Sequence, residues 1–126
     1  MQQRPMGLTL LAAYMAVTTV LNLVLLATLV AEDRELTVLT NSANLASAVY
    51  VLVGGLIYVI LANGYWQMKS WAWPAGLAIH AVSLVIIGFQ MTVGAKFGDV
   101  STGLIVHGVA ILYLRRPEIQ QVFGRQ

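Results

Sequence analysis

The chain has 126 residues, of which 59% are hydrophobic and 10% are charged, with a net charge of +2 and no cysteine. Soluble globular domains carry about 25% charged residues, so a soluble fold of this size could not cover its surface. The composition indicates a one-domain integral membrane protein in contact with the lipid bilayer, and the few basic residues give no sign of nucleic-acid binding. The absence of cysteine excludes disulfide scaffolds, thiolate metal sites and dithiol redox chemistry.

Four apolar segments are long enough to cross a membrane, which takes roughly 20 helical residues for ~30 Å of hydrocarbon. The predicted spans are about 7–30, 43–65, 71–94 and 99–116. The last span has a short uninterrupted apolar part, 100–114, so we expect it to gain length from Asp99 and from snorkelling of Arg115 and Arg116. The sequence therefore predicts an all-α fold, a single bundle of four antiparallel transmembrane helices over residues 1–126.

The distribution of basic residues orients this bundle, because cytoplasmic loops of membrane proteins are enriched in lysine and arginine. Four crossings place Arg34 and Lys96 on one side and a larger set on the other: Arg4, Lys69, Arg115, Arg116 and Arg125. We therefore predict a multi-pass protein of the inner (cell) membrane with both termini in the cytoplasm. The acidic loop AEDRE, 31–35, then faces outward.

Aromatic residues gather at the turn between the second and third predicted spans: Tyr65, Trp66, Trp71 and Trp73. Such a cluster is typical of the aromatic belt at a membrane surface. The tail after Pro117 spaces Ile119, Val122 and Phe123 as a helix would. It is either a short amphipathic helix lying on the inner face of the membrane or a frayed end.

Each predicted span carries one stripe of small and polar residues, and in lipid such stripes mark contacts between helices. For most of these residues, interhelical packing and hydrogen bonding is the favoured interpretation over a ligand site. The residues that we expect in these contacts are Tyr14, Asn22, Gly54, Ser83, Gln90 and Gly103.

The only two histidines lie in matching frames, GLAIHAV at 76–82 and GLIVHGV at 103–109. His80 and His107 fall at similar depth in consecutive antiparallel spans, each on the face that carries small residues. An imidazole inside the membrane is a candidate functional group because it needs a polar partner there.

Three interpretations of His80 and His107 stay open. The favoured one is a structural hydrogen bond in the core, without a cofactor or a metal. The second is cofactor binding, with both imidazoles as axial ligands of haem b or one of them on the magnesium of a chlorophyll-type pigment. The third is a proton relay.

Catalysis and ion-coupled transport find little support in the sequence. No aspartate, glutamate, lysine or arginine lies inside a predicted span, and coupled transporters usually need one there. No serine, histidine and acid share a depth that would suit hydrolysis. We therefore predict that the protein is not an enzyme.

Three stretches together resemble a broad group of uncharacterised small bacterial and archaeal membrane proteins: RPMGLTLLA, GYWQMKSWAWPAGLAIHAVSL and LYLRRPEIQQVFG. Members have four spans, a Trp-Ala-Trp or Trp-Ala-Arg turn and an Arg-Pro-Glu-hydrophobic tail. The resemblance implies the four-span fold and transfers no functional residue.

From the sequence alone, the leading hypothesis is a non-enzymatic accessory or interaction subunit of a membrane assembly, associating with itself or with other membrane subunits. The alternative is a haem- or pigment-binding bundle that uses His80 and His107. A second alternative is a small-solute channel formed between protomers, with Asn22 or Gln90 in its lining.

Overall fold

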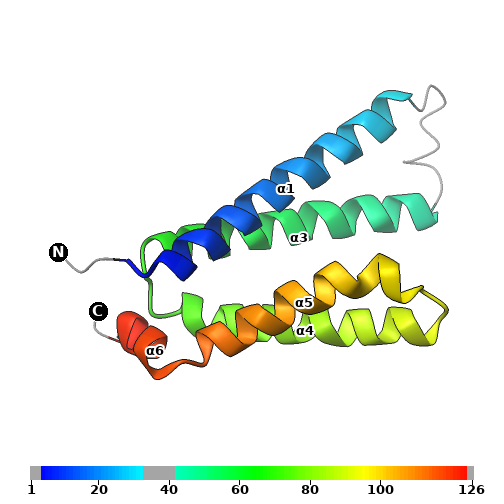
Figure 1. Cartoon of the computed structure of the whole chain (residues 1–126). Helices are drawn as coiled ribbons and strands as arrows, with labels where there is room; N and C mark the ends of the chain where they lie inside the picture. The colour runs from blue at the N-terminus through cyan, green and yellow to red at the C-terminus, as the bar shows by residue number, and fades with distance from the viewer. Residues whose placement is uncertain (1–3, 33–41, 125–126) are drawn as a thin grey trace.

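The computed structural model describes residues 4–32 and 42–124, and these are helical apart from short turns. The helices are α1 (Met6–Glu32), α3 (Ser42–Trp66), α4 (Ala72–Thr92), α5 (Phe97–Leu114) and α6 (Pro117–Gly124), as drawn in Figure 1. The prediction of an all-α chain with four long helices is confirmed. Most of the acidic loop and the basic residues Arg34 and Arg125, which entered the prediction of orientation, lie outside the described residues.

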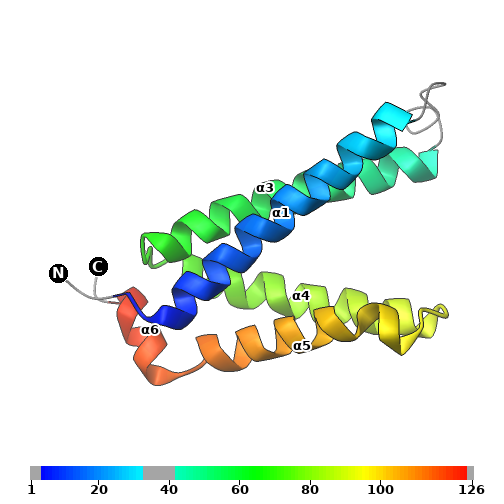
Figure 2. The ribbon, with the colours of Figure 1, turned by 45° about the horizontal axis from the view of Figure 1, so that its top comes forward.

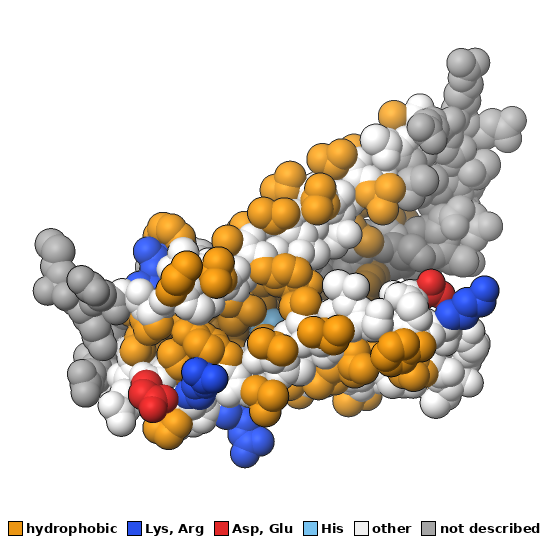
Figure 3. All heavy atoms as spheres, in the orientation of Figure 1, with side chains coloured by type: hydrophobic (Ala, Val, Ile, Leu, Met, Phe, Trp, Pro, Cys, Tyr) orange, Lys and Arg blue, Asp and Glu red, His pale blue; other side chains and the backbone are white. Residues whose placement is uncertain are grey.

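Four helices have the length and apolar composition needed to cross a membrane. The candidate spans are Met6–Thr28, Ala48–Trp66, Ala72–Thr92 and Phe97–Leu114. On the face shown in Figure 3, hydrophobic side chains cover the helices, and the charged side chains lie toward the two ends of the molecule. The chain is therefore a small multi-pass membrane protein.

The four long helices form two hairpins, α1 with α3 and α4 with α5 (Figure 1). The hairpins meet at the end where both termini and the turn between α3 and α4 lie, which we call the closed end. They diverge toward the opposite end, the open end, and Figure 2 shows the same divergence from a second direction. A cleft lies between the two hairpins, and residues of all four long helices line it.

Within the first hairpin, α1 and α3 approach closely where Thr19 meets Gly55. A Cβ added at Gly55 would lie 3.1 Å from Thr19 Cγ2, so a larger residue would force the helices apart. The hydroxyl of Thr19 donates to the carbonyl oxygens of Met15 at 2.9 Å and Gly55 at 3.4 Å. These bonds satisfy a buried hydroxyl within the membrane, where no water is available to do so.

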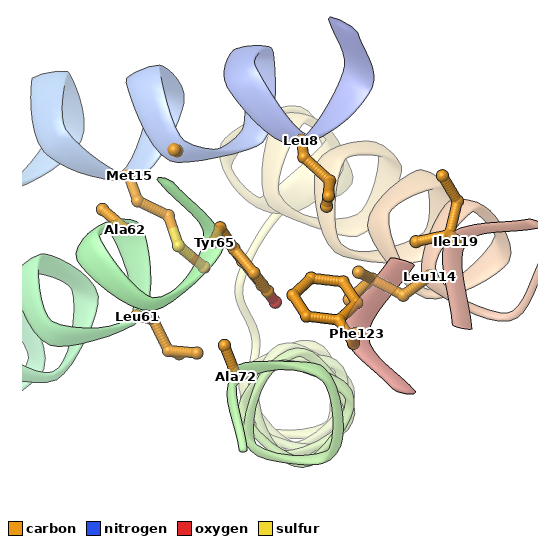
Figure 4. Close-up of a cluster of buried hydrophobic side chains, with 10 residues drawn as sticks. Leu8, Met15, Leu61, Ala62, Tyr65, Ala72, Leu114, Ile119 and Phe123 are labelled. Atoms are coloured by element: carbon orange, nitrogen blue, oxygen red, sulfur yellow. The ribbon is translucent and has the colours of Figure 1, made fainter. Parts of the chain in front are cut away.

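The closed end holds the hydrophobic core, which Figure 4 shows in close-up. The tilted rings of Tyr65 and Phe123 lie with their centroids 6.0 Å apart, a favourable separation for two aromatic rings. The indole Nε1 of Trp73 donates to the carbonyl oxygen of Leu114 at 2.8 Å and so joins α4 to the end of α5. All five helices contribute to this core: Leu8, Ala12, Met15, Leu61, Ala62, Tyr65, Ala72, Leu114, Ile119 and Phe123.

The C-terminal tail forms helix α6, the first of the two alternatives that its spacing allowed. The position expected for its apolar face is corrected, however. Ile119 and Phe123 are 5% and 2% exposed and pack into the protein core, so this face covers the closed end and does not lie in lipid.

The aromatic cluster at the turn between α3 and α4 divides into two groups, and its prediction as one surface belt is corrected. Trp66 and Trp71 are exposed, and the guanidinium of Arg4 lies 3.5 Å above the ring centre of Trp66. Tyr65 is fully buried. It fits because Gly76 on α4 has no side chain, and a Cβ there would overlap the Tyr65 hydroxyl.

Candidate binding site

The structure brings the two histidines into direct contact across the second hairpin. Nδ1 of His80, on α4, lies 2.8 Å from Nδ1 of His107, on α5, and the ring centroids are 5.1 Å apart. His80 is completely buried, and His107 is 8% exposed. The sequence placed the two residues at the same depth but left open whether they face one another, and the structure shows that they do.

The matching frames around the histidines have a common packing role. In each frame a glycine lies one helical turn before the histidine, so both occupy the same face of the helix. A Cβ at Gly76 would overlap the Tyr65 hydroxyl, and one at Gly103 would lie 2.9 Å from Cδ1 of Ile87. Each glycine therefore admits a large side chain beside its histidine, and at Gly103 this contact joins α5 to α4.

The contact between the two imidazoles restricts their protonation. A hydrogen bond between two nitrogens needs one donor and one acceptor, and a neutral imidazole carries its proton on only one nitrogen. When both rings are neutral, one is protonated on Nδ1 and the other on Nε2. The two rings are therefore held in opposite tautomers. The ring that donates from Nδ1 has a bare Nε2, and the ring that accepts at Nδ1 has an N–H at Nε2.

His107 also forms part of the wall of a cleft between the two hairpins, which we call the interhairpin cleft. Its volume is about 460 Å³, within the range of roughly 300–1,000 Å³ typical of ligand pockets. In Figure 3 a histidine side chain is visible in the hollow between the hairpins. All four long helices contribute polar side chains to the cleft: Tyr14, Thr18, Thr19, Asn22, Tyr50, Tyr58, Ser83 and His107.

The polar groups of the cleft lie deep in the apolar part of the bundle. Thr18 is near the middle of the span Met6–Thr28, Tyr58 near the middle of Ala48–Trp66, and His107 near the middle of Phe97–Leu114. None of the described residues that line the cleft is charged. The cleft is therefore an uncharged and mostly apolar pocket that carries several polar side chains, at a depth where the surrounding solvent is hydrocarbon.

Hydroxyl groups connect the two hairpins at the cleft. The Tyr58 hydroxyl, on α3, interacts with the Ser83 side chain, on α4, and Ser83 also donates to the carbonyl oxygen of Ile79 at 3.0 Å. Tyr14 and Tyr50 line the same cleft as Tyr58. Three phenol groups thus share one wall region, each able to donate or accept a hydrogen bond.

The residues expected in interhelical contacts are distributed over three environments. Tyr14 and Ser83 are half-buried and line the cleft, and Gly103 packs against Ile87. Gly54 also borders the cleft, but a Cβ added there would meet nothing within 4 Å, and the close helix contact is made by its neighbour Gly55. Close packing was expected at Gly54, and the structure shows it at the next residue, Gly55.

Asn22 and Gln90 also differ from the expectation. Both side chains are exposed, Asn22 at the edge of the cleft and Gln90 near the end of α4, outside the cleft lining. A buried contact between helices is thus not their environment.

Two buried groups, Thr19 and Tyr65, were missed by reasoning from the sequence. Thr19 stands next to Thr18, and one position on a helix is enough to move a side chain from the cleft edge to the contact between α1 and α3. Tyr65 stands among interfacial tryptophans, and its burial depends on Gly76 in the next helix. The pair Tyr65 and Gly76 could have been found only by testing which small residue opposes which aromatic one.

In the observed arrangement, the Nδ1 atoms of His80 and His107 are too close together to hold a metal ion between them. Two imidazole nitrogens on opposite sides of one metal ion are about 4 Å apart, since imidazole–metal bonds are roughly 2.0 Å. Here the nitrogens are 2.8 Å apart and bonded to each other. Within the described part of the chain, no three histidine, cysteine, aspartate or glutamate side chains gather as a metal site either.

Comparisons of the chain with protein-family models, with curated proteins and with solved structures gave no match. The functional argument therefore depends on the histidine pair and the interhairpin cleft.

Proposed function

We propose that this protein is a non-enzymatic accessory subunit of a membrane assembly, and that it works by holding a molecule from the bilayer in the interhairpin cleft. The observation that carries the proposal is the convergence of polar side chains from four helices on one open cleft at mid-membrane depth. Polar groups that face hydrocarbon without partners are unfavourable, so an occupant with polar atoms of its own would stabilise this surface.

The non-enzymatic part of the proposal comes from the kinds of residue available. The chain has no cysteine, and its acidic residues lie outside the predicted spans or at their ends. The cleft offers hydroxyls, one amide and one imidazole, which suit recognition by hydrogen bonds.

The accessory role is supported by the size and shape of the bundle. The hairpins diverge toward the open end (Figure 1), and much of each long helix exposes apolar side chains, such as Val85 on α4 at 73% and Leu112 on α5 at 68%. Such surfaces fit either lipid or neighbouring helices, and we propose that part of them contacts another copy of the chain or another membrane subunit. Isolation from native membranes in mild detergent is expected to give a particle larger than the monomer, and a lone monomer would contradict the accessory role.

We propose further that the protein belongs to the group of small four-span proteins that it resembles, and that it lies in the inner membrane with both termini in the cytoplasm. The excess of basic residues on the side of the termini supports this orientation. Reporter fusions at the two ends are expected to show cytoplasmic activity at both.

The cleft itself can be tested by photocrosslinking in native membranes. A benzophenone amino acid at Val51, which lines the cleft, is expected to form an adduct that the same group at the exposed Val85 does not form. Mass spectrometry of the adducts separates a small molecule from a polypeptide. Identical adduct patterns from the two positions would contradict a working role for the cleft.

Binding of a haem or a chlorophyll-type pigment by His80 and His107 is the alternative proposal. A haem with two axial histidines would require His80 and His107 to break their hydrogen bond and separate. The absorption spectrum of the protein purified from cells with adequate haem supply tests this point. A Soret band that is lost in both His80→Ala and His107→Ala would restore the cofactor proposal.

A further inference from the structure

We propose that the interhairpin cleft binds a neutral, lipid-soluble ring compound that carries a carbonyl oxygen, of the quinone class, and that Nε2–H of His107 donates the hydrogen bond that holds it. This inference rests on the proposed function, because it names the class of molecule that the cleft would hold. It follows from the histidine tautomers, the depth of the polar groups and the absence of charge in the described lining.

The direction of the hydrogen bond between the histidines determines what His107 offers to the cleft. Nε2 of His80 is buried and has no hydrogen-bond partner. If His107 donated from Nδ1, this buried Nε2 of His80 would be an N–H without an acceptor, the less common and more costly kind of unpaired group. The favoured arrangement has His80 donating from Nδ1, which leaves a bare Nε2 on His80 and an N–H at Nε2 of His107.

A second polar atom in this part of the bundle is also buried without a partner. The hydroxyl oxygen of Tyr65 also lacks a hydrogen bond, and it lies against Gly76, one helical turn before His80 on the same face of α4. A tyrosine hydroxyl can donate and accept a hydrogen bond at the same time, so Tyr65 is compatible with either tautomer of His80. With His80 donating from Nδ1 to His107, the imidazole N–H that remains for the cleft is Nε2–H of His107.

The depth of these groups selects the chemistry of the ligand. A phospholipid has its charged headgroup at the membrane surface, whereas His107, Tyr58 and Thr18 lie near the middle of their spans. A charged group at that depth would also face a lining without an opposite charge among its described residues. A neutral ring with carbonyl oxygens dissolves in the hydrocarbon and brings acceptors to this depth.

The shape of the cleft agrees with a ligand of this class. It lies between hairpins that diverge toward the open end (Figures 1 and 2), so a molecule dissolved in the bilayer reaches it from the side. Its walls combine aliphatic and tyrosine side chains, which pack on a flat ring, with a donor at His107 for a carbonyl oxygen.

The proposal can be tested by titrating the purified protein in mild detergent with a short-tailed benzoquinone. Saturable one-to-one binding is expected for the unmodified chain. His107→Phe removes the donor and is expected to weaken binding about tenfold, the equivalent of one hydrogen bond. His107→Gln keeps an N–H donor and is expected to bind within a few-fold of the unmodified chain. Gln90→Leu, a polar-to-apolar change outside the cleft, is expected to have no effect.

Two results would overturn the proposal. One is equal binding of the benzoquinone and of the same ring and tail without carbonyl oxygens. The other is unchanged affinity in His107→Phe, with its folding checked by thermal unfolding. A cleft-specific adduct at Val51 that proves to be a polypeptide or a phospholipid would overturn the quinone assignment and leave the proposed function standing. Absence of any cleft-specific adduct would overturn both.

Discussion

The closed end and the interhairpin cleft are built from similar helices but differ in what fills the space between them. At the closed end, side chains from all five helices fill the interior, and α6 covers it. In the cleft, the same helices diverge, and hydroxyls, an amide and an imidazole line a volume of about 460 Å³. The difference indicates that the bundle is held together at one end and is available for binding between its hairpins.

This division has a physical basis in the membrane. Helices in lipid gain little from burying aliphatic side chains, since the surrounding acyl chains are equally apolar, so close packing and interhelical hydrogen bonds stabilise the fold. The closed end supplies both, through the contact of Gly76 with Tyr65 and the bond from Trp73 to Leu114. Variants at the closed end should therefore change stability, and variants in the cleft should change binding.

The largest expected effect is the loss of the Phe123 ring. Phe123→Ala removes a buried aromatic contact with Tyr65 and uncovers the closed end. The free energy of unfolding is expected to fall by about 3 kcal/mol, as for other buried phenylalanines. Thermal unfolding in mild detergent measures the change, and Phe89→Ala is the matched control because that ring is 65% exposed. Equal losses in the two variants would show that α6 contributes nothing specific.

The next effect is expected at the glycine beneath Tyr65. Gly76→Ala places a methyl group where the Tyr65 hydroxyl lies, and overpacking of this kind costs about 2 kcal/mol. Gly88→Ala, on the same helix, meets nothing within 4 Å and is expected to leave the unfolding temperature unchanged. Adding Tyr65→Phe to Gly76→Ala should restore part of the loss because it removes the overlapping oxygen. No difference between the two alanine variants would contradict the observed packing of α3 on α4.

A smaller effect is expected for the indole hydrogen bond. Trp73→Phe leaves the Leu114 carbonyl oxygen without its donor, and the free energy of unfolding should fall by about 1 kcal/mol. Trp71→Phe changes an exposed indole of the same turn and serves as the control. A larger loss of stability in Trp71→Phe than in Trp73→Phe would show that Trp71, and not Trp73, makes the stabilising contact.

The smallest effect on stability is expected in the cleft. Tyr58→Phe removes the hydroxyl that interacts with Ser83, and single interhelical hydrogen bonds in membranes contribute about 0.6 kcal/mol. The same variant should nevertheless change the yield of the Val51 photoadduct, since Tyr58 lines the cleft beside Val51. A loss of stability as large as that of Phe123→Ala, with an unchanged adduct, would reverse the roles assigned to the two regions.

The sequence was sufficient for the fold class because span length and apolar composition follow directly from residue types. It also placed His80 and His107 at one depth, since depth depends only on counting along a helix. Which residues meet across helices depends on rotation and crossing of the helices, which no single span encodes. For that reason Gly54 was expected where Gly55 makes the contact, Tyr65 was expected at the surface, and Gln90 was expected in an interface.

The most direct test of the account is a ¹⁵N NMR spectrum of histidine-labelled protein, which contains only two imidazoles. Single variants at His80 and His107 assign the signals. The account predicts opposite neutral tautomers, Nδ1–H for His80 and Nε2–H for His107, with a shift of the His107 Nε2 signal when the benzoquinone is added. The reverse tautomers, or signals that do not respond to a saturating amount of the benzoquinone, would contradict the assignment of His107 as the donor in the cleft.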